Sequence, residues 1–344
     1  MSSGLTPLDI IARDRIATSG PITFVELVEL ALYDLDHGFY TAVGEAGRRG
    51  DFLTSPEVGP LFGHVVANAL DAEWTRLGRP ESFTVLEYGA GPGTLARSVL
   101  AAEPGCGPAL RYAAIESSAK QRAKHPDGIE SFETLPNNLL AGGVVGVVLA
   151  NEFLDNLAFA PFELVEGEPH ELAVTLDSDG DLSTVPGTPI PAEIATRLGD
   201  APNGVLQSKA ADWLSAMVDL LARGRVIVID YARTETVAVE IRTYADHERG
   251  GDPLVGLGTK DITVDVDLAQ LQAAVRPADA VTLQADWLAR NGIEELVEEG
   301  RQMWEAGAAT GSLAALRGRS RVREAEALTE RSGLGGFYVA EWAI

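Results

Sequence analysis

Cysteine, histidine and lysine are scarce in this sequence, and each shortage narrows the functions open to it. Cys106 is the only cysteine in 344 residues, so neither an intramolecular disulfide nor a thiolate metal cluster is expected. The 5 histidines lie far apart with no ligand spacing, which predicts surface or capping roles and no metal site. A few lysines against many arginines are typical of a GC-rich bacterial genome. The histidines are His37, His64, His125, His170 and His247.

Long hydrophobic runs and positive charge are also lacking. The longest apolar run, Gly142–Ala150, is too short to cross a bilayer, and Asp9, Arg13 and Asp14 interrupt the region where a signal peptide is hydrophobic. The 27 basic residues face 51 acidic ones, and the net charge of −24 disfavours nucleic acids and acidic membranes as partners. We therefore expect a cytoplasmic protein, whose charge suits basic protein segments and a cationic cofactor.

The clearest functional signal is the stretch Thr84–Thr94, which reads TVLEYGAGPGT. An apolar, β-branched run is followed by Gly89, Gly91 and Gly93 and then by the helix-like segment Leu95–Ala102. Glycines are needed where the backbone turns sharply and comes close to a ligand, because a Cβ would block both. The pattern of strand, tight turn and helix predicts a nucleotide-like ligand, although a purely structural turn is the alternative.

The glycine spacing favours S-adenosylmethionine (SAM) over a dinucleotide. The dinucleotide fingerprint G-x-G-x-x-G would need glycine where this chain has Thr94, and the pattern is instead E-x-G-x-G-x-G, beginning at Glu87. A sulfonium ligand has no phosphate to place at the helix N-terminus, and it tolerates an acidic neighbour such as Glu87.

A second strand follows at the expected distance. Arg111–Ile115 is apolar and ends at Glu116 and Ser117, where such folds place an acid that accepts hydrogen bonds from ribose hydroxyls. Glu116 fits that role, and the alternative is a solvated acid that opens the next helix, Ser117–Lys124. The two signals together predict a cofactor site.

The N-terminal region is predicted to be helical. Thr6–Ser19 and Thr23–Leu35 form two helices, and Ser55 is the predicted N-cap of a helix over 58–76 with Pro56 at the first helical position. Between them, the glycine-rich loop 36–50 has the composition of a mobile lid. Its Tyr40 either lines a substrate channel or is a core aromatic.

Further strands and helices alternate along the rest of the chain. The buried strand Val144–Ala150 ends at Asn151 and Glu152, and polar residues after a central strand lie at the crevice where doubly wound sheets bind ligands. The other predicted elements are a hairpin over 171–176 and 181–185, a helix over 210–222, a strand over 225–230, a helix over 262–275, strands over 280–284 and 336–342, a weak strand over 129–133, and helices between 286 and 330.

This alternation predicts an α/β, Rossmann-like fold of seven strands, with a parallel sheet and helices on both faces. It is the architecture of SAM-dependent methyltransferases. The expected organisation is an N-terminal helical cap with a glycine-rich lid over 1–80, then a Rossmann-like domain over 81–344. Substrate-binding insertions are expected at about 157–205 and 232–262.

The chain resembles the MidA family of SAM-dependent methyltransferases over most of its length. The motifs that carry the resemblance are GDFLTSPE (50–57), LEYGAGPGTL (86–95), NEFLDN (151–156), DPL (252–254) and DITVDVD (261–267). The family includes mitochondrial members associated with assembly of respiratory complex I, which implies methylation of an arginine in a protein subunit. The bacterial character of this chain leaves the substrate open.

Two departures from the family pattern stand out. Asp230 and Tyr231 are followed by Ala232 and Arg233, where the family usually has an aromatic pair containing glycine, and the loop at Asp265 lacks a usual His or Asn. The first affects the shape of a loop and the second affects substrate contacts. Neither affects the glycine turn.

Methyl transfer is an in-line displacement, so the protein must align the acceptor and hold or remove its proton. Glu152 and Asp155 are the candidate catalytic carboxylates, because together they could bind an arginine guanidinium. Alternatively, Asn151 and Glu152 contact the cofactor or cap the next helix, and Asp155 is solvated. The candidate cofactor-binding residues are Thr54, Ser55, Pro56, Glu87, Gly89, Ala90, Gly91, Glu116, Ser117 and Asn151.

Three other functions remain open at this stage. The main one is an assembly factor that binds a partner protein without catalysis. An NAD-dependent oxidoreductase is disfavoured by Thr94 and by the lack of a convincing catalytic His or Tyr-x-x-x-Lys pair. A small-molecule methyltransferase would need an enclosed apolar pocket. The favoured expectation is a protein arginine methyltransferase that acts on a protein substrate. The sequence leaves open whether the enzyme is a monomer or a homodimer.

Overall fold

The computed structural model describes residues 4–43, 54–140, 143–199, 201–236, 240–245, 248–307 and 312–344. Contacts divide the chain into two compact units. The first unit comprises Met1–Asp51, Phe153–Ala216 and Ala232–Pro277, and the second comprises Phe52–Glu152, Met217–Tyr231 and Ala278–Ile344. The predicted helix over 210–222 is present as α9 (Ser208–Leu220), and the chain passes between the units within it.

The second unit contains the predicted seven-stranded sheet. Its strands are β2 (Phe83–Tyr88), β3 (Leu110–Ile115), β4 (Glu130–Phe132), β5 (Val144–Asn151), β10 (Leu221–Asp230), β16 (Ala280–Leu283) and β17 (Tyr338–Ala343). Their order is β16-β17-β10-β5-β2-β3-β4, with β17 antiparallel to both neighbours and the pairs from β10 to β4 parallel. The weak strand expected near Ile129 is therefore confirmed as β4, and the sheet is mostly parallel.

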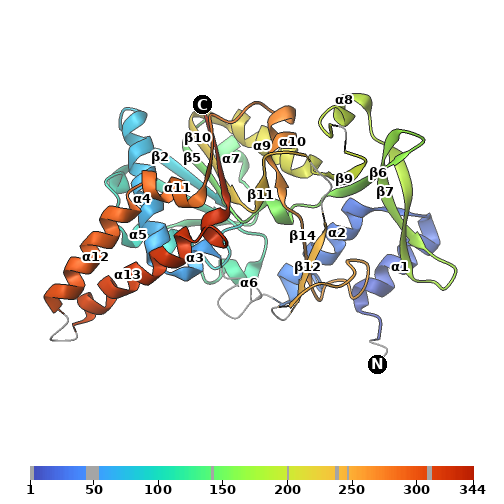
Figure 1. The fold of residues 1–344 in the computed structure, drawn as a ribbon, viewed down its shortest axis with the longest axis horizontal. Helices are drawn as coiled ribbons and strands as arrows, with labels where there is room; N and C mark the ends of the chain where they lie inside the picture. Colours follow the sequence, from blue (N-terminus) through green and yellow to red (C-terminus); the bar gives the residue numbers. More distant parts are fainter. Residues whose placement is uncertain are drawn as a thin grey trace. The chain divides into compact units, whose positions relative to one another are not determined.

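The helices of the second unit are α3 (Ser55–Val58), α4 (Pro60–Arg76), α5 (Thr94–Ala101), α6 (Ala119–Arg122), α7 (Asn137–Leu140), α11 (Gln284–Arg290), α12 (Ile293–Gly307) and α13 (Leu313–Thr329). Of these, α4, α5 and α11 pack against the sheet, and α12 and α13 form a pair that extends away from it (Figure 1). Val85, Val147 and Ile227 project from one face of the strands into a core shared with α4, α5, α11 and α12. Leu86 and Val148 project from the other face and are equally buried, which explains the near-continuous apolar runs of these strands.

The helix predicted over 58–76 is divided in two. The chain turns out of the helical conformation at Gly59 and begins α4 at Pro60. A Cβ on Gly59 would lie 2.2 Å from the carboxyl carbon of Glu324, whose oxygen accepts the Leu61 N–H at 2.9 Å. The carboxylate of Glu324, distant in sequence, thus satisfies the N-terminus of α4.

The first unit combines the N-terminal helices with small sheets. Its elements are α1 (Pro7–Ser19), β1 (Ile22–Thr23), α2 (Phe24–Tyr33), the π-helix η1 (Phe39–Val43), the 3-10 helix η3 (Leu154–Asn156), β6 (Ala160–Val165), β7 (Glu168–Leu176), β8 (Leu182–Pro189), α8 (Ala192–Ala195), β9 (Asn203–Leu206), β11 (Ala232–Arg233), β12 (Arg242–Ala245), β13 (Glu248–Arg249), β14 (Asp261–Thr263), β15 (Val266–Asp267) and α10 (Leu268–Ala274). The predicted hairpin is β7 paired antiparallel with β8. Leu27, Phe159 and Ile262 share one buried core, so segments far apart in sequence form this unit together.

The helix predicted over 262–275 begins later than expected. Residues 261–263 and 266–267 are strands, and only α10 is helical. Ile262, Thr263 and Val264 are β-branched and buried, which favours extended pairing over helix. Asp267 is the N-cap of α10, because its side chain accepts the Gln270 N–H at 2.9 Å.

The contact-based division differs from the expected domain boundary near residue 80. Residues 54–80 belong with the sheet, because α4 places Leu61, Phe62 and Val65 in the sheet's core. The expected insertions at about 157–205 and 232–262 lie in the first unit with the N-terminal helices. Residues 44–50 of the predicted lid lie outside the described residues.

None of the helices in the described ranges is both long and apolar enough to cross a bilayer. In the same ranges, no group of three or more His, Cys, Asp or Glu side chains is arranged to hold a metal ion.

Candidate functional site

The glycine turn lies between β2 and α5 in the second unit. Gly89, Gly91 and Gly93 have φ angles of 66°, 53° and 73°, in the left-handed region that favours glycine. The N–H groups of Gly89 and Ala90 donate to the carbonyl oxygen of Ile115, at the end of the neighbouring β3. A Cβ on Gly91 would meet no described protein atom within 4 Å, so this backbone is open to close approach by a ligand.

Glu116 lies beside this turn, as expected from its spacing. It follows β3 directly, and its Oε2 accepts the Gly91 N–H at 2.9 Å while its Oε1 accepts the Ser118 N–H at 2.7 Å. Ser117 is exposed next to it. The half-buried carboxylate is therefore fixed at the glycine turn with lone pairs left for hydroxyl donors.

Glu87 is below the surface and only 4% exposed. Its Oε2 accepts the hydroxyl hydrogen of Tyr112 at 2.7 Å. Burial raises the pKa of Glu87 to about 8, and the Tyr112 hydrogen bond opposes that rise while the charge of Glu116 adds to it. Glu87 ends the run that leads into the turn, and its bond to Tyr112 links β2 to β3.

A second group of candidates lies at the end of β5, the strand next to β2. Glu152 adopts a left-handed φ of 50°, which is uncommon for a residue with a side chain. Its Oε1 accepts the N–H of Ser55 and the side-chain amide of Asn151, both at 3.1 Å. The Oδ1 of Asn151 is buried and has no hydrogen-bond partner within the described residues. Tyr88 of β2 pairs with Ala150 of β5, and the two strands are parallel. The glycine turn and this second group therefore follow the carboxyl ends of adjacent strands, at the same edge of the sheet.

Ser55 differs from its predicted role. It is the first residue of α3, and Thr54 occupies the N-cap position without a side-chain capping bond. The hydroxyl of Ser55 instead donates to the side-chain oxygen of Gln284 at 3.1 Å, and its N–H is used by Glu152. Pro56 is the second residue of α3, where its missing N–H leaves no bond unmade.

Asp155 lies in the first unit and is 5% exposed. Its Oδ2 accepts the Thr263 hydroxyl hydrogen at 2.9 Å, and its Oδ1 accepts the side-chain amide of Asn156 at 2.9 Å. Burial raises the pKa of Asp155 to about 6, against the lowering effects of Thr263 and Arg242. It is therefore a hydrogen-bonded interior carboxyl, in contrast to the expected alternative of a solvated acid.

Tyr40 joins the same interior cluster. Its hydroxyl lies 2.7 Å from Oδ1 of Asn156 and 2.9 Å from Oδ1 of Asp261, and its ring stacks on Tyr33. Burial raises the pKa of Tyr40 well above its ordinary value, so the hydroxyl keeps its proton and donates. Of the two expectations for Tyr40, this packing favours the core aromatic.

Several residues of these networks were not found from the sequence. Tyr112, Gln284 and Thr263 each complete the hydrogen bonding of a candidate residue from 25 to 229 positions away. Tyr112 and Gln284 lie in no motif, and Thr263 lies in DITVDVD (261–267) without a spacing that pairs it with Asp155. Periodicity places Tyr112 on a buried strand face, but nothing in the sequence pairs it with Glu87.

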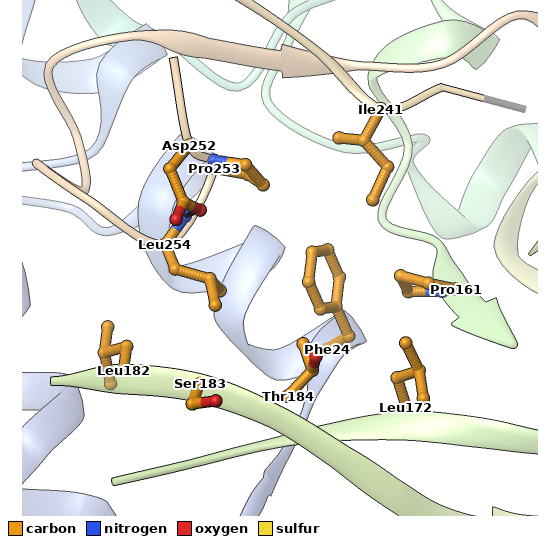
Figure 2. Close-up of a pocket in the computed structure, with 10 residues that line it drawn as sticks. All are labelled: Phe24, Pro161, Leu172, Leu182, Ser183, Thr184, Ile241, Asp252, Pro253 and Leu254. Carbon is orange, nitrogen blue, oxygen red and sulfur yellow. Dashed lines mark hydrogen bonds between the residues drawn. The ribbon is translucent and has the colours of Figure 1, made fainter. Parts of the chain in front are cut away.

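A separate cavity of about 370 Å³ lies in the first unit (Figure 2). Its walls are mostly apolar, with Phe24 from α2 pointing into it and Leu172 from β7 at its side. Asp252 contributes one carboxylate at the opposite side. None of the candidate site residues lines this cavity.

Comparisons with known proteins agree with the geometry of the glycine turn. Residues 65–285 match a family described as "Putative S-adenosyl-L-methionine-dependent methyltransferase". The chain is 28% identical to the Drosophila melanogaster protein arginine methyltransferase NDUFAF7 homolog, mitochondrial, over 74% of this chain and 67% of the relative. It is 27% identical to the human protein arginine methyltransferase NDUFAF7, mitochondrial, over 75% of this chain and 66% of the relative. The chain thus spans about two thirds of these relatives' length.

A solved structure is similar over nearly the whole chain. A protein from Burkholderia thailandensis, crystallised with S-adenosyl-homocysteine bound, is 26% identical with a TM-score of 0.81, over 98% of this chain and 92% of that one. A second, native crystal structure from the same organism gives a TM-score of 0.79 at 26% identity, over 98% of this chain and 91% of that one. The family match covers more than half of the sequence. This chain therefore belongs to the family of SAM-dependent methyltransferases, with SAM as its cofactor.

Proposed function

We propose that this enzyme methylates an arginine side chain of a protein substrate. The observation that carries the proposal is the carboxylate of Glu152, held at the end of β5 beside the strand that leads into the glycine turn. The curated relatives named protein arginine methyltransferases support arginine as the acceptor. The net charge of −24 also suits a basic substrate segment.

The candidate cofactor-binding residues fit SAM on three structural grounds. The open space at Gly91 admits a ligand against the backbone, and Glu116 can accept from the two ribose hydroxyls. The buried Oδ1 of Asn151, which has no partner in the described part of the chain, offers an acceptor to the cofactor's amino group. The proposed contacts are completed by Thr54, Ser55, Pro56, Gly89, Ala90 and Ser117 around this edge, with Glu87 in the strand that leads into the turn.

When bound, SAM supplies an electrophilic methyl group on its sulfonium sulfur. Glu152 would accept hydrogen bonds from the substrate guanidinium and orient one nitrogen toward the methyl group. As the nitrogen–carbon bond forms, the methyl–sulfur bond breaks, the thioether leaves, and Glu152 would take the proton that the nitrogen loses. Asp155 is the second carboxylate of the proposal. Its bonds to Thr263 and Asn156 fix the turn η3, which follows Glu152 in the chain.

The decisive experiment is transfer of a labelled methyl group from SAM to a panel of arginine-containing peptides and to protein extract, followed by acid hydrolysis. We expect labelled methylarginine. Glu152→Gln should lower kcat about 100-fold or more, as for loss of a general base, while the affinity for S-adenosylhomocysteine (SAH) stays within about 3-fold. Glu103→Gln is the matched control, because Glu103 also has a left-handed φ, of 51°, and is exposed.

Two outcomes would contradict the proposal. Label recovered only in another residue or in a small molecule would replace arginine as the acceptor. Equal transfer by wild type and Glu152→Gln would remove Glu152 from the chemistry. Light scattering on the same preparation distinguishes a monomer from a homodimer.

A further inference from the structure

His125 contacts the glycine turn from a segment that the cofactor motifs do not include. It follows α6, and its Nε2 lies 2.9 Å from the carbonyl oxygen of Gly91. A carbonyl can only accept, so Nε2 carries the hydrogen in this bond and Nδ1 has the lone pair in the neutral ring. Nδ1 is buried and has no hydrogen-bond partner among the residues described.

The segment around His125 packs against the turn at further points. A Cβ on Gly93 would lie 2.8 Å from Cδ of Pro126 and 3.2 Å from Cδ2 of His125. Arg97, on α5, donates from Nη2 to the carbonyl oxygen of Lys124 at 3.0 Å. The segment 124–126 is thus fixed to both the turn and the helix that follows it.

Gly91 is consequently held on both sides. Its N–H donates to Glu116 and its carbonyl accepts from His125. These two bonds matter for its backbone conformation, because a glycine with a φ of 53° and open space beside it has no side chain to restrict φ and ψ. Ordering a loop during binding reduces affinity, and a loop ordered beforehand avoids that cost. We propose that His125 is a positioning residue for SAM binding, which acts through the Gly91 carbonyl to keep the glycine turn in its binding conformation.

The test compares two substitutions of similar length by calorimetric titration with SAH. His125→Met removes the donor and should weaken SAH binding about 3- to 10-fold, as expected for one hydrogen bond. His125→Gln keeps an N–H donor and should bind SAH close to wild type. The matched control is His170→Met in the first unit, because Nδ1 of His170 likewise lies 3.1 Å from the carbonyl oxygen of Gly187.

The expected pattern is weaker SAH binding for His125→Met alone, with ligand-free melting temperatures lowered similarly in both Met variants. Equal SAH binding by His125→Met and wild type would overturn the proposal, and so would equal weakening by His125→Gln or His170→Met. The tautomer of His125 can also be measured by NMR in the wild-type protein. The nitrogen chemical shifts of His125 should show the Nε2–H tautomer with and without SAH, and the Nδ1–H tautomer would exclude the donated bond.

Discussion

The glycine turn of the second unit and the Asp155 cluster of the first unit are held by different kinds of hydrogen bond. At the turn, side chains bond to backbone groups, since Glu116 and His125 hold the N–H and the carbonyl of Gly91. In the Asp155 cluster, side chains bond to side chains, as in the links between Asp155 and Thr263 and between Tyr40 and Asn156. The turn therefore depends on the left-handed backbone conformation that glycine allows, whereas the cluster depends on which side chains meet.

The largest effect should come from filling the open space at the turn. Gly91→Val should weaken SAH binding at least about 100-fold, because the new side chain occupies ligand space and strains a left-handed residue. Gly78→Val is the control, since Gly78 has a φ of 84° and equally open space but lies after α4. Calorimetry should show normal binding in the control, and equal losses in both variants would attribute the effect to strain.

Removing the charge of Glu116 should have the next largest effect. Glu116→Gln should weaken SAH binding about 30-fold, the size expected when a charged hydrogen-bond acceptor is lost. The control is Glu130→Gln, which removes a carboxylate on the adjacent strand β4. The side chain of Glu130 forms an ion pair with Arg111, and its loss should leave SAH binding unchanged. Unaltered binding by Glu116→Gln would remove this residue from the cofactor site.

The first unit should respond in stability and not in cofactor affinity. Thr263→Val leaves Oδ2 of the buried Asp155 without its hydroxyl donor, which should lower the free energy of unfolding by about 2 kcal/mol. Urea unfolding measures this loss, and titration with SAH should show wild-type affinity. A large drop in SAH affinity would mean that the first unit's cluster contributes to the cofactor site.

The smallest effect concerns the pH dependence of the second unit. The pKa of Glu87 is raised from 4.5 to about 8, so between these values the unfolded chain loses this proton while the folded protein keeps it. Stability therefore falls as pH rises through this window, by at most about 1.4 kcal/mol per pH unit from this group. Glu87→Gln removes the contribution, so unfolding at pH 6 and pH 7 should differ less in the variant. Identical slopes would contradict the raised pKa.

The sequence predicted more of the second unit than of the first. The strands at Val85, Tyr112 and Val144 were correctly placed because buried parallel strands are short apolar runs ended by turn residues. The predicted start of the helix over 262–275 was wrong, because the β-branched residues Ile262 and Thr263 pair with β12 as a strand. The break at Gly59 precedes Pro60, and the residue before a proline disfavours the helical conformation, whereas no local pattern predicts that Glu324 binds the start of α4.

By itself, the sequence determined the strand-turn-helix unit and its glycine spacing, because these depend on backbone conformation over a few residues, and it placed Glu116 directly after the next strand. The tertiary structure decided that Ser55 binds Glu152 and Gln284, that Asp155 is an interior carboxyl and that His125 holds the turn. Each of these bonds joins residues from separate segments. Such contacts form only when the core packs, since hydrogen bonds and pKa shifts depend on burial and on neighbours that residue spacing does not specify.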